Sequence, residues 1–574
     1  MDIINLKAAD HFINRELSQL EFNRRVLCQA QDETLPILER LKYLCIVSTN
    51  LDEFFEIRVG GLQQREEAGS GPPGPDMLSP QQILAAIHEQ ARILVTEQYR
   101  LLNTEIIPAL AKEGVNLIRR SAWTEKQRRW LHDYFQREVV PTLSPIALDT
   151  ARPFPRILNK SLNFVVGLEG LHAFGRPCHR AIVQAPRSLP RLIQLPSELS
   201  DAGNNDFVFL SSIIHAFVDE LFSGMKITGC YQFRVTRNSD LYVDAEEVDN
   251  LIRALEGKLA ASRYGAAVRL EIADDCPRSI IENLLNVFEL KKEDLYRVDG
   301  PVNLNRLMTV YDLTHRDDLK YPPFTPGLPR ELLEAPDIFA LLKHQDLLLN
   351  HPYESFDPVM EFVSRAANDS KVVAIKLTLY RTAQDSAIID HLVAAAQAGK
   401  EVTVCVELRA RFDEAINIGF ANRLQEVGAH VVYGIVGFKT HCKMAMVVRR
   451  ETNGLRRYAH LGTGNYHPGT ARVYVDYSLL TANEEITEDV HQVFLQLTGM
   501  MQTPPLNKLI QAPFKLHSRL IEMIEREATA ASRGADAHII AKLNALIEPE
   551  IIMALYRASV AGVKIQLIVR GICA

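Results

Sequence analysis

The chain has 574 residues, 47% of them hydrophobic, and a formal net charge of −7, a length that predicts several domains. It contains no run of eighteen apolar residues, and its mixed, charged N-terminus is not typical of a signal peptide. Its eight cysteines include no Cys-x-x-Cys pair, so we expect a cytoplasmic protein with reduced thiols; the acidic balance argues against a general nucleic-acid binder.

Residues 1–112 predict a helical N-terminal domain, because apolar side chains recur at helical spacing in stretches such as LSQLEFNRRVLCQAQ. In the segment LDEFFEIRV we expect Phe54, Phe55 and Ile57 to be core residues. Asn50 directly precedes that segment and could be a helix N-cap.

Residues 113–318 predict an α+β middle domain, because helical patterns such as EKQRRWLHDYFQREVV alternate there with short β-prone runs such as YQFRVT. We find no catalytic motif in this domain. Residues 319–505 then predict an α/β domain, and residues 506–574 predict the start of a second one.

The first α/β domain begins with a β-α-β unit whose strands end in arginine. The apolar run 375–381 ends at Arg381, and the run 402–414 reaches Arg411 after an alanine-rich helix. Ligands bind at the carboxyl ends of strands in open α/β sheets, so these arginines are candidate anion ligands. Alternatively, Arg411 and its neighbour Arg409 could form surface ion pairs, an interpretation that carries more weight for Arg409.

A positive segment follows at 434–472, with seven Lys/Arg and one acidic residue in an acidic chain. Phosphate is a usual partner for such a local positive field. The segment contains His441 and Lys443 beside a β-prone run, KMAMVV, so we expect both side chains on one face of a strand. Lys443 can hold a phosphate oxygen, and His441 can attack phosphorus or carry a proton.

A glycine loop lies just beyond, at Gly462-Thr463-Gly464-Asn465. The two glycines allow backbone N–H groups to approach an anion, and Asn465 can donate a further hydrogen bond. Each pattern alone also has a simpler interpretation, a solvated strand and an ordinary turn.

The α/β unit is repeated. Ala398-Gly399 and Ala561-Gly562 close similar helices 163 positions apart, and each is followed by an apolar strand. The equivalent of the His441 strand is then expected near position 604, beyond Ala574. We therefore expect an incomplete C-terminus and little activity from these 574 residues alone.

The His-x-Lys pair, the glycine loop and the repeat together resemble the phospholipase D superfamily, although Val448 stands where that superfamily usually has an aspartate. The longer motifs resemble the polyphosphate kinase family of bacterial enzymes; they are STNLDEFFEIRVGGL, LTLYR, VELRARFDE, FKTHCKMAM, YAHLGTGNYH, TARVYVDYSLLTA and LIVRGIC. This resemblance implies reversible transfer of the ATP γ-phosphate to a polyphosphate chain, with release of ADP, through a phosphohistidine.

The resemblance also implies roles for individual residues. His441 matches the phosphorylated histidine, and His460 matches a second histidine that supports the site. The remaining matches are ATP contacts at Asn50, Tyr474 and Arg570, and a Mg²⁺–phosphate site at Arg381 and Arg411. Tyr474 could equally be a packed strand aromatic.

The implied architecture is a multidomain α/β protein: a helical N-terminal domain, an α+β dimerisation and tunnel domain, and two phospholipase D-like domains, the second incomplete. Implied partners are ATP, ADP and polyphosphate, with Mg²⁺ as cofactor and a homodimer or homotetramer as assembly. The resemblance allows peripheral attachment at the inner face of the membrane.

Two other classes stay open at this point. A phospholipase D-like phosphodiesterase or nuclease would use the same phosphohistidine chemistry with water or an alcohol as acceptor, but the missing aspartate and the additional arginines count against it. A non-catalytic scaffold that only binds polyanions would not need the second histidine strand expected near position 604.

Overall fold

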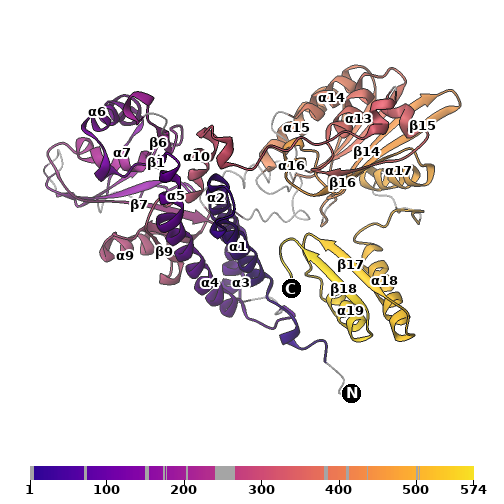
Figure 1. The fold of residues 1–574 in the computed structure, drawn as a ribbon, viewed down its shortest axis with the longest axis horizontal. Coiled ribbons are helices and arrows are strands. Elements are labelled where there is room, and N and C mark those ends of the chain that lie inside the picture. The colour runs from indigo at the N-terminus through magenta and orange to yellow at the C-terminus, as the bar shows by residue number, and fades with distance from the viewer. Residues whose placement is uncertain are drawn as a thin grey trace. The chain divides into compact units, whose positions relative to one another are not determined.

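The computed structural model describes residues 5–69, 74–148, 154–171, 175, 177–201, 205–239, 265–335, 337–380, 386–408, 413–435, 437–499, 502 and 505–574. The chain forms two compact units (Figure 1). The first contains the described residues within 1–240, 261–322 and 521–574, and the second those within 323–520. Among the described residues, no helix is both long and apolar enough to cross a membrane.

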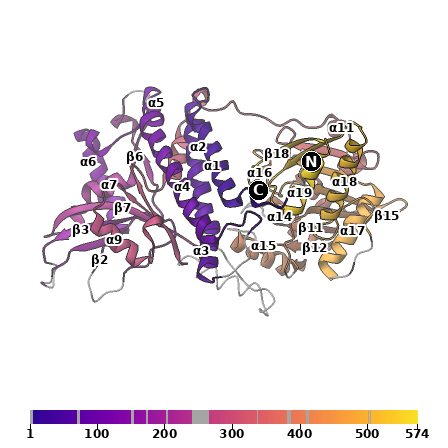
Figure 2. The same ribbon diagram turned by 90° about the horizontal axis from the view of Figure 1, so that it is seen from below.

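The first unit begins with helices packed side by side, as the sequence predicts (Figure 2). They are α1 (Arg15–Gln31), α2 (Ile37–Glu53), α3 (Gly60–Glu67), α4 (Pro80–Leu101) and α5 (Ile107–Lys112), with a π-helical turn at Phe54–Val59 between α2 and α3. Phe54, Phe55 and Ile57 are buried, which confirms their assignment to the core. Asn50 lies within α2, so the N-cap interpretation is wrong; its Nδ2 donates to Oδ1 of Asn23 at 3.0 Å.

The middle of the chain forms two sheets. The larger has the order β2 (Ile146–Ala147), β4 (Arg180–Gln184), β3 (Asn163–Glu169), β7 (Lys226–Arg237), β8 (Ala267–Ala273) and β9 (Leu295–Val298). The smaller has the order β1 (Val115–Leu117), β6 (Asn205–Phe209) and β5 (Leu192–Gln194). The helices here are α6 (Glu125–Tyr134), α7 (Leu210–Phe217), α9 (Arg278–Val287) and α10 (Met308–Leu313).

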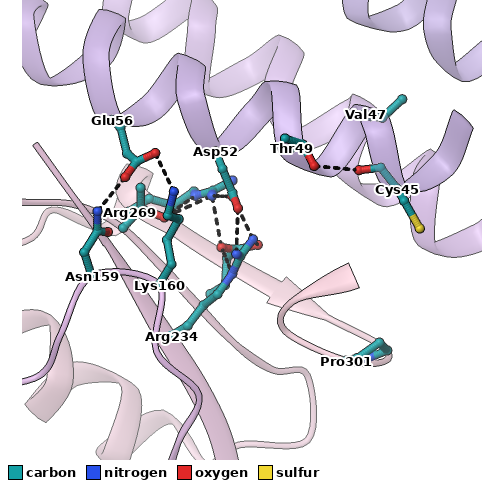
Figure 3. A network of polar contacts seen from close by, with 12 residues as sticks. Cys45, Val47, Thr49, Asp52, Glu56, Asn159, Lys160, Arg234, Arg269 and Pro301 are labelled. Atoms are coloured by element: carbon teal, nitrogen blue, oxygen red, sulfur yellow. Dashed lines mark hydrogen bonds and ion pairs between the residues drawn. The ribbon is translucent and has the colours of Figure 1, made fainter. Parts of the chain in front are cut away.

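A buried ionic network joins α2 to this larger sheet (Figure 3). It contains Asp52 from α2, Arg234 from β7, and Arg269 and Glu271 from β8, and each of the four side chains is at most 5% exposed. Nη1 and Nη2 of Arg234 donate to the two carboxylate oxygens of Asp52 at 2.9 Å each. The guanidinium of Arg269 lies 4.5 Å from the ring centroid of Phe55. The network fixes the last turn of α2 against the sheet, because buried charges must be paired.

The second unit is built on a seven-stranded sheet. Its order is β10 (Leu347–His351), β16 (Asp476–Thr481), β15 (Gly454–Gly462), β14 (Lys443–Glu451), β11 (Val372–Leu379), β12 (Glu401–Val406) and β13 (His430–Tyr433). β11, β12 and β13 are parallel, and the other neighbours are antiparallel.

Helices cover both faces of this sheet (Figure 1). One face packs against α12 (Ile338–Leu342), α13 (Asp357–Asn368), α14 (Ala387–Gln397) and α15 (Glu414–Glu426). The other face packs against α17 (Glu484–Gly499). Residues of β12 and β14 contribute alternately to the two apolar clusters, as side chains of a strand buried on both faces must.

The last described residues form α18 (Leu516–Ser532), β17 (His538–Leu543), α19 (Pro549–Val560) and β18 (Lys564–Val569), and β17 pairs with β18 in parallel. This unit repeats β11-α14-β12, and β18 begins and ends 163 positions after β12. The sequence repeat is therefore a structural repeat. The multidomain fold with a helical N-terminal region and mixed sheets is confirmed.

Candidate active site

Most of the residues that the sequence singled out lie along one end of the seven-stranded sheet, where β10, β11 and β15 stop and where β14 and β16 begin. We call this end of the sheet the catalytic edge. β14 runs antiparallel to β11, so Lys443 at its start lies near the carboxyl end of β11. Gly462, the last residue of β15, is opposite Lys443, and Asp476 at the start of β16 is opposite His351 at the end of β10. Segments far apart in sequence thus meet where an α/β sheet usually binds its ligand.

His441 lies two residues before β14, in the loop that leads into it, and is exposed. The prediction that His441 and Lys443 are both strand residues is therefore wrong for His441. The cause is Thr378, whose hydroxyl donates to the Cys442 carbonyl at 2.8 Å and accepts from the Met444 N–H at 3.0 Å. These side-chain bonds replace ladder bonds at this point, so the strand begins only after the chain has passed His441.

Two aromatic and cationic contacts fix the surroundings of His441. Its ring meets the ring of Tyr380 edge to face, with centroids 4.9 Å apart. Nζ of Lys443 donates to the His441 carbonyl at 2.6 Å and lies 5.0 Å from the Tyr380 centroid. Lys443 is only 6% exposed. The structure therefore brings an exposed imidazole and a largely buried ammonium together at the sheet edge.

His460 on β15 is completely enclosed. Its Nδ1 lies 2.7 Å from the hydroxyl of Tyr466, and among the described residues its Nε2 has no hydrogen-bond partner. Burial, with a smaller contribution from His351, lowers the pKa of His460 to about 3. His460 is therefore neutral at physiological pH, and it can donate or accept a hydrogen bond but does not supply a positive charge.

His351 belongs to the same edge, and sequence reasoning missed it. Its Nδ1 donates to the Glu354 carbonyl at 2.9 Å, which leaves Nε2 to accept from the hydroxyl of Ser478 at 2.9 Å. A histidine at the end of an edge strand gives no periodic signal. Only the pairing of β10 with β16 reveals its position.

Close packing, rather than backbone conformation, is the reason that glycine is needed at Gly462 and Gly464. A Cβ at Gly462 would lie 3.0 Å from Cε1 of His460, and one at Gly464 would lie 2.5 Å from a carboxylate oxygen of Asp476. That carboxylate also accepts from the hydroxyl of Thr463 at 2.8 Å. Oδ1 of Asn465 is buried without a hydrogen-bond partner among the described residues. The loop is thus tightly packed and holds an amide that is not fully satisfied.

A buried carboxylate supports the loop that precedes His441. Glu407, at the end of β12, is 2% exposed and accepts from the Thr440 N–H at 2.8 Å. This bond holds the chain one residue before His441. Cys442 packs against the apolar cluster under α17.

Other sequence candidates fall elsewhere. Tyr474 is 43% exposed in the turn between α16 (Pro468–Ala471) and β16, so the packed-strand alternative is wrong. Asn50 and Arg570 belong to the first unit, the latter directly after β18. Arg381, Arg409 and Arg411 lie outside the described residues.

The side chains at this edge do not form a ready-made metal cage. Within the described residues, no three His, Cys, Asp or Glu side chains converge around His441. Mg²⁺ takes one or two carboxylates and completes its octahedron with water and substrate phosphates. The described donors around His441 would therefore not hold a Mg²⁺ ion by themselves, and they are compatible with one that arrives on a nucleotide.

Comparison with known proteins agrees with this geometry. Four family models match in succession: the polyphosphate kinase N-terminal domain at residues 12–118, the middle domain at 126–310, C-terminal domain 1 at 337–503 and C-terminal domain 2 at 509–574. The whole candidate edge, from His351 to Asp476, lies within C-terminal domain 1.

Individual relatives indicate the same family. The chain is 55% identical to a polyphosphate kinase of Xylella fastidiosa, over 98% of this chain and 80% of that protein. It is 54% identical to one of Pseudomonas aeruginosa, over 98% and 81%. The crystal structure of polyphosphate kinase from Porphyromonas gingivalis matches with a TM-score of 0.83 at 31% identity, covering 98% of this chain and 81% of that one. The chain belongs to the polyphosphate kinase family.

Proposed function

We propose that this protein transfers the γ-phosphate of ATP to the end of an inorganic polyphosphate chain, reversibly, through a phosphohistidine at His441. The observation that carries the proposal is the placement of an exposed imidazole beside the largely buried Lys443 ammonium at the carboxyl edge of a mixed sheet. The proposal assigns the protein to the ATP:polyphosphate phosphotransferases.

In the first step, a ring nitrogen of neutral His441 attacks the γ-phosphorus of ATP. The P–N bond forms as the P–O bond to the β-phosphate breaks, and ADP leaves with the electron pair. Lys443 offsets the negative charge on the transferred group, which is usually the main source of catalysis in phosphoryl transfer. Its bond to the His441 carbonyl keeps it in place for this.

In the second step, a terminal oxygen of polyphosphate attacks the same phosphorus, the P–N bond breaks and His441 is regenerated. Neutral His460 is buried, with no hydrogen-bond partner for Nε2 among the described residues. Its ring packs against Gly462 and supports the glycine loop, and the proton for a leaving group must come from elsewhere. Backbone groups of Gly462 and Gly464, with the amide of Asn465, surround the transferring phosphate.

The finer assignments come from the family resemblance and stay proposals. Arg381 and Arg411 would contact the transferring phosphate, and Asn50, Tyr474 and Arg570 would contact ATP. Mg²⁺ would enter as the ATP complex, since no three metal-ligating side chains of the described residues converge around His441. We also propose a homodimer or homotetramer in the cytoplasm that can attach peripherally to the membrane.

The test uses the protein expressed from its complete reading frame, incubated with γ-labelled ATP and Mg²⁺. We expect acid-labile phosphate on the wild type and on His430→Ala, and none on His441→Ala. His430 is a suitable control because it is a solvent-exposed histidine of the same sheet, with a side chain 71% exposed. Long-chain polyphosphate should follow only from the labelled proteins. Release of the label as free phosphate without polymer would instead indicate a hydrolase.

A further inference from the structure

A basic hollow lies in the first unit, among residues that take no part in the proposed reaction. It has a volume of about 590 Å³ and is formed by the turn that precedes α6, by α6 itself and by α7, which lie side by side in Figure 1. Its lining, which we call the arginine hollow, is Arg119, Arg120, Ser121, Arg128, His215 and Ala216. No acidic residue lines it.

The positive charges of the arginine hollow are not neutralised locally. Among the described residues, none of the three guanidinium groups forms an ion pair. The carboxylate of Glu220, on the turn after α7, is already engaged by Nε2 of His132 at 3.0 Å and by the amide of Gln136. The chain as a whole carries a net charge of −7, so an uncompensated group of three arginines is a local exception.

Neighbouring contacts hold two of these groups in place. Nη1 of Arg120 contacts Nδ1 of His215. The guanidinium carbon of Arg128 lies 5.6 Å from the ring centroid of Phe217, the last residue of α7. A neutral imidazole accepts a hydrogen bond from a guanidinium without cancelling its charge, so this contact positions Arg120 and leaves its positive charge uncompensated. A phosphate chain in the hollow would supply that compensation.

The lining selects a phosphate chain over a nucleotide or a nucleic acid. Guanidinium groups bind phosphate oxygens with paired N–H donors. A base needs an aromatic face on which to stack, and none is offered here: Phe217 is 5% exposed and already contacts Arg128, and Trp123 packs against the core. The hollow is an open depression rather than an enclosed cavity, so it can accept a segment of a long polymer.

From these observations we infer that the arginine hollow is a second binding site for inorganic polyphosphate, which holds the polymer at a segment away from its reacting end. The inference rests on the proposed function for the identity of the polymer. Two attachment points on one chain raise the effective concentration of the reacting end at the catalytic edge. The hollow would therefore favour long products without changing the chemical step.

The test compares two triple variants of the protein expressed from its complete reading frame. One is Arg119→Gln with Arg120→Gln and Arg128→Gln. The other, Lys126→Gln with Arg129→Gln and Arg137→Gln, removes the same charge from cations on or beside α6 that do not line the hollow. We measure the Kd for long-chain polyphosphate without nucleotide, the kcat for ATP turnover, the length of the product, and the mass by light scattering.

We expect the first variant to bind long-chain polyphosphate at least about tenfold more weakly, and to make shorter products at unchanged kcat, while the control behaves as wild type. Equal effects in both variants would show only general surface charge and overturn the inference. A fall in mass specific to the first variant, with polymer binding retained, would make the hollow a subunit interface. Weaker binding in a protein that makes no polymer from ATP would retain the hollow and refute the proposed function.

Discussion

Charged groups are used in two opposite ways in this molecule. In the network of Asp52, Arg234, Arg269 and Glu271, each charge contacts at least one of opposite sign, with Nε of Arg234 only 2.5 Å from Oε2 of Glu271. Burial alone would raise the pKa of Asp52, but the two guanidinium groups outweigh it and hold that pKa below its usual range. This arrangement leaves no charge available for a ligand.

The catalytic edge is organised differently. Lys443 is largely buried, and its Nζ contacts the His441 carbonyl and the Tyr380 ring. His460 keeps a buried nitrogen without a partner among the described residues, and His441 is exposed. A buried polar atom without a partner costs stability, so we expect a ligand or a water to satisfy Nε2 of His460. The comparison separates charged groups that hold two parts of the fold together from polar groups that gather beside an exposed histidine.

The largest effect should come from the histidine itself. We expect His441→Ala to lower polymer synthesis by at least about 10⁴-fold, because no other described group at the edge offers a nucleophilic nitrogen in solvent. Its melting temperature should match that of wild type, since the side chain is exposed. Rates of polymer formation and thermal unfolding are measured together, with His430→Ala as control. Synthesis within tenfold of wild type by a folded His441→Ala protein would exclude it as the obligatory nucleophile.

A substitution in the ionic network should lower stability, whereas the substitution of His441 lowers activity. Asp52→Asn leaves two buried arginines with one carboxylate, and removing one partner of a buried ionic group typically costs about 3–5 kcal/mol in the free energy of unfolding. Asp133→Asn, at an exposed position on α6, should change it by no more than about 0.5 kcal/mol. Urea unfolding followed by tryptophan fluorescence reports on this unit, because both tryptophans lie in it. A loss below about 1 kcal/mol would place the network among ordinary surface pairs.

Lys443 tests whether a buried cation can serve catalysis rather than stability. Lys443→Met keeps the apolar stem, so we expect little change in melting temperature and a fall in kcat of about 10²–10³-fold. Lys371→Met, an exposed lysine just before β11, is the matched control. A large loss of stability with unchanged kcat would instead make Lys443 part of the fold.

Sequence reasoning reached the architecture because hydrophobic periodicity and the 163-residue repeat are properties of consecutive residues. It failed where one side chain redirects the backbone, as Thr378 does at the start of β14, which begins only after His441. It also missed His351 and the ionic network, since Asp52 and Arg269 are 217 positions apart and meet only through packing. Predicted roles for Arg381 and Arg411 stay predictions, because these residues lie outside the described part of the chain.

The smallest expected effect is the pH dependence of stability that the buried ring of His460 causes. Its pKa is about 3 in the folded protein, against about 6.5 when unfolded. Between those values the unfolded chain binds the extra proton, so stability is fully present above about pH 6.5 and declines as the pH falls toward 3. Because of this single group, the free energy of unfolding of the second unit should be about 2 kcal/mol lower at pH 5 than at pH 7.

Hydrogen exchange of the amides in β14 and β15, corrected for the pH dependence of intrinsic exchange, measures that change in the unit that contains His460. We expect His460→Asn to be less stable than wild type at pH 7 but to lose about 2 kcal/mol less on going to pH 5. His430→Asn should follow the wild-type slope, because an exposed ring pays no desolvation cost. Parallel pH dependences for wild type and His460→Asn would mean that His460 takes up a proton as readily in the folded protein as in the unfolded chain. His460 could then carry a proton at the catalytic edge instead of serving only as a neutral hydrogen-bonding group.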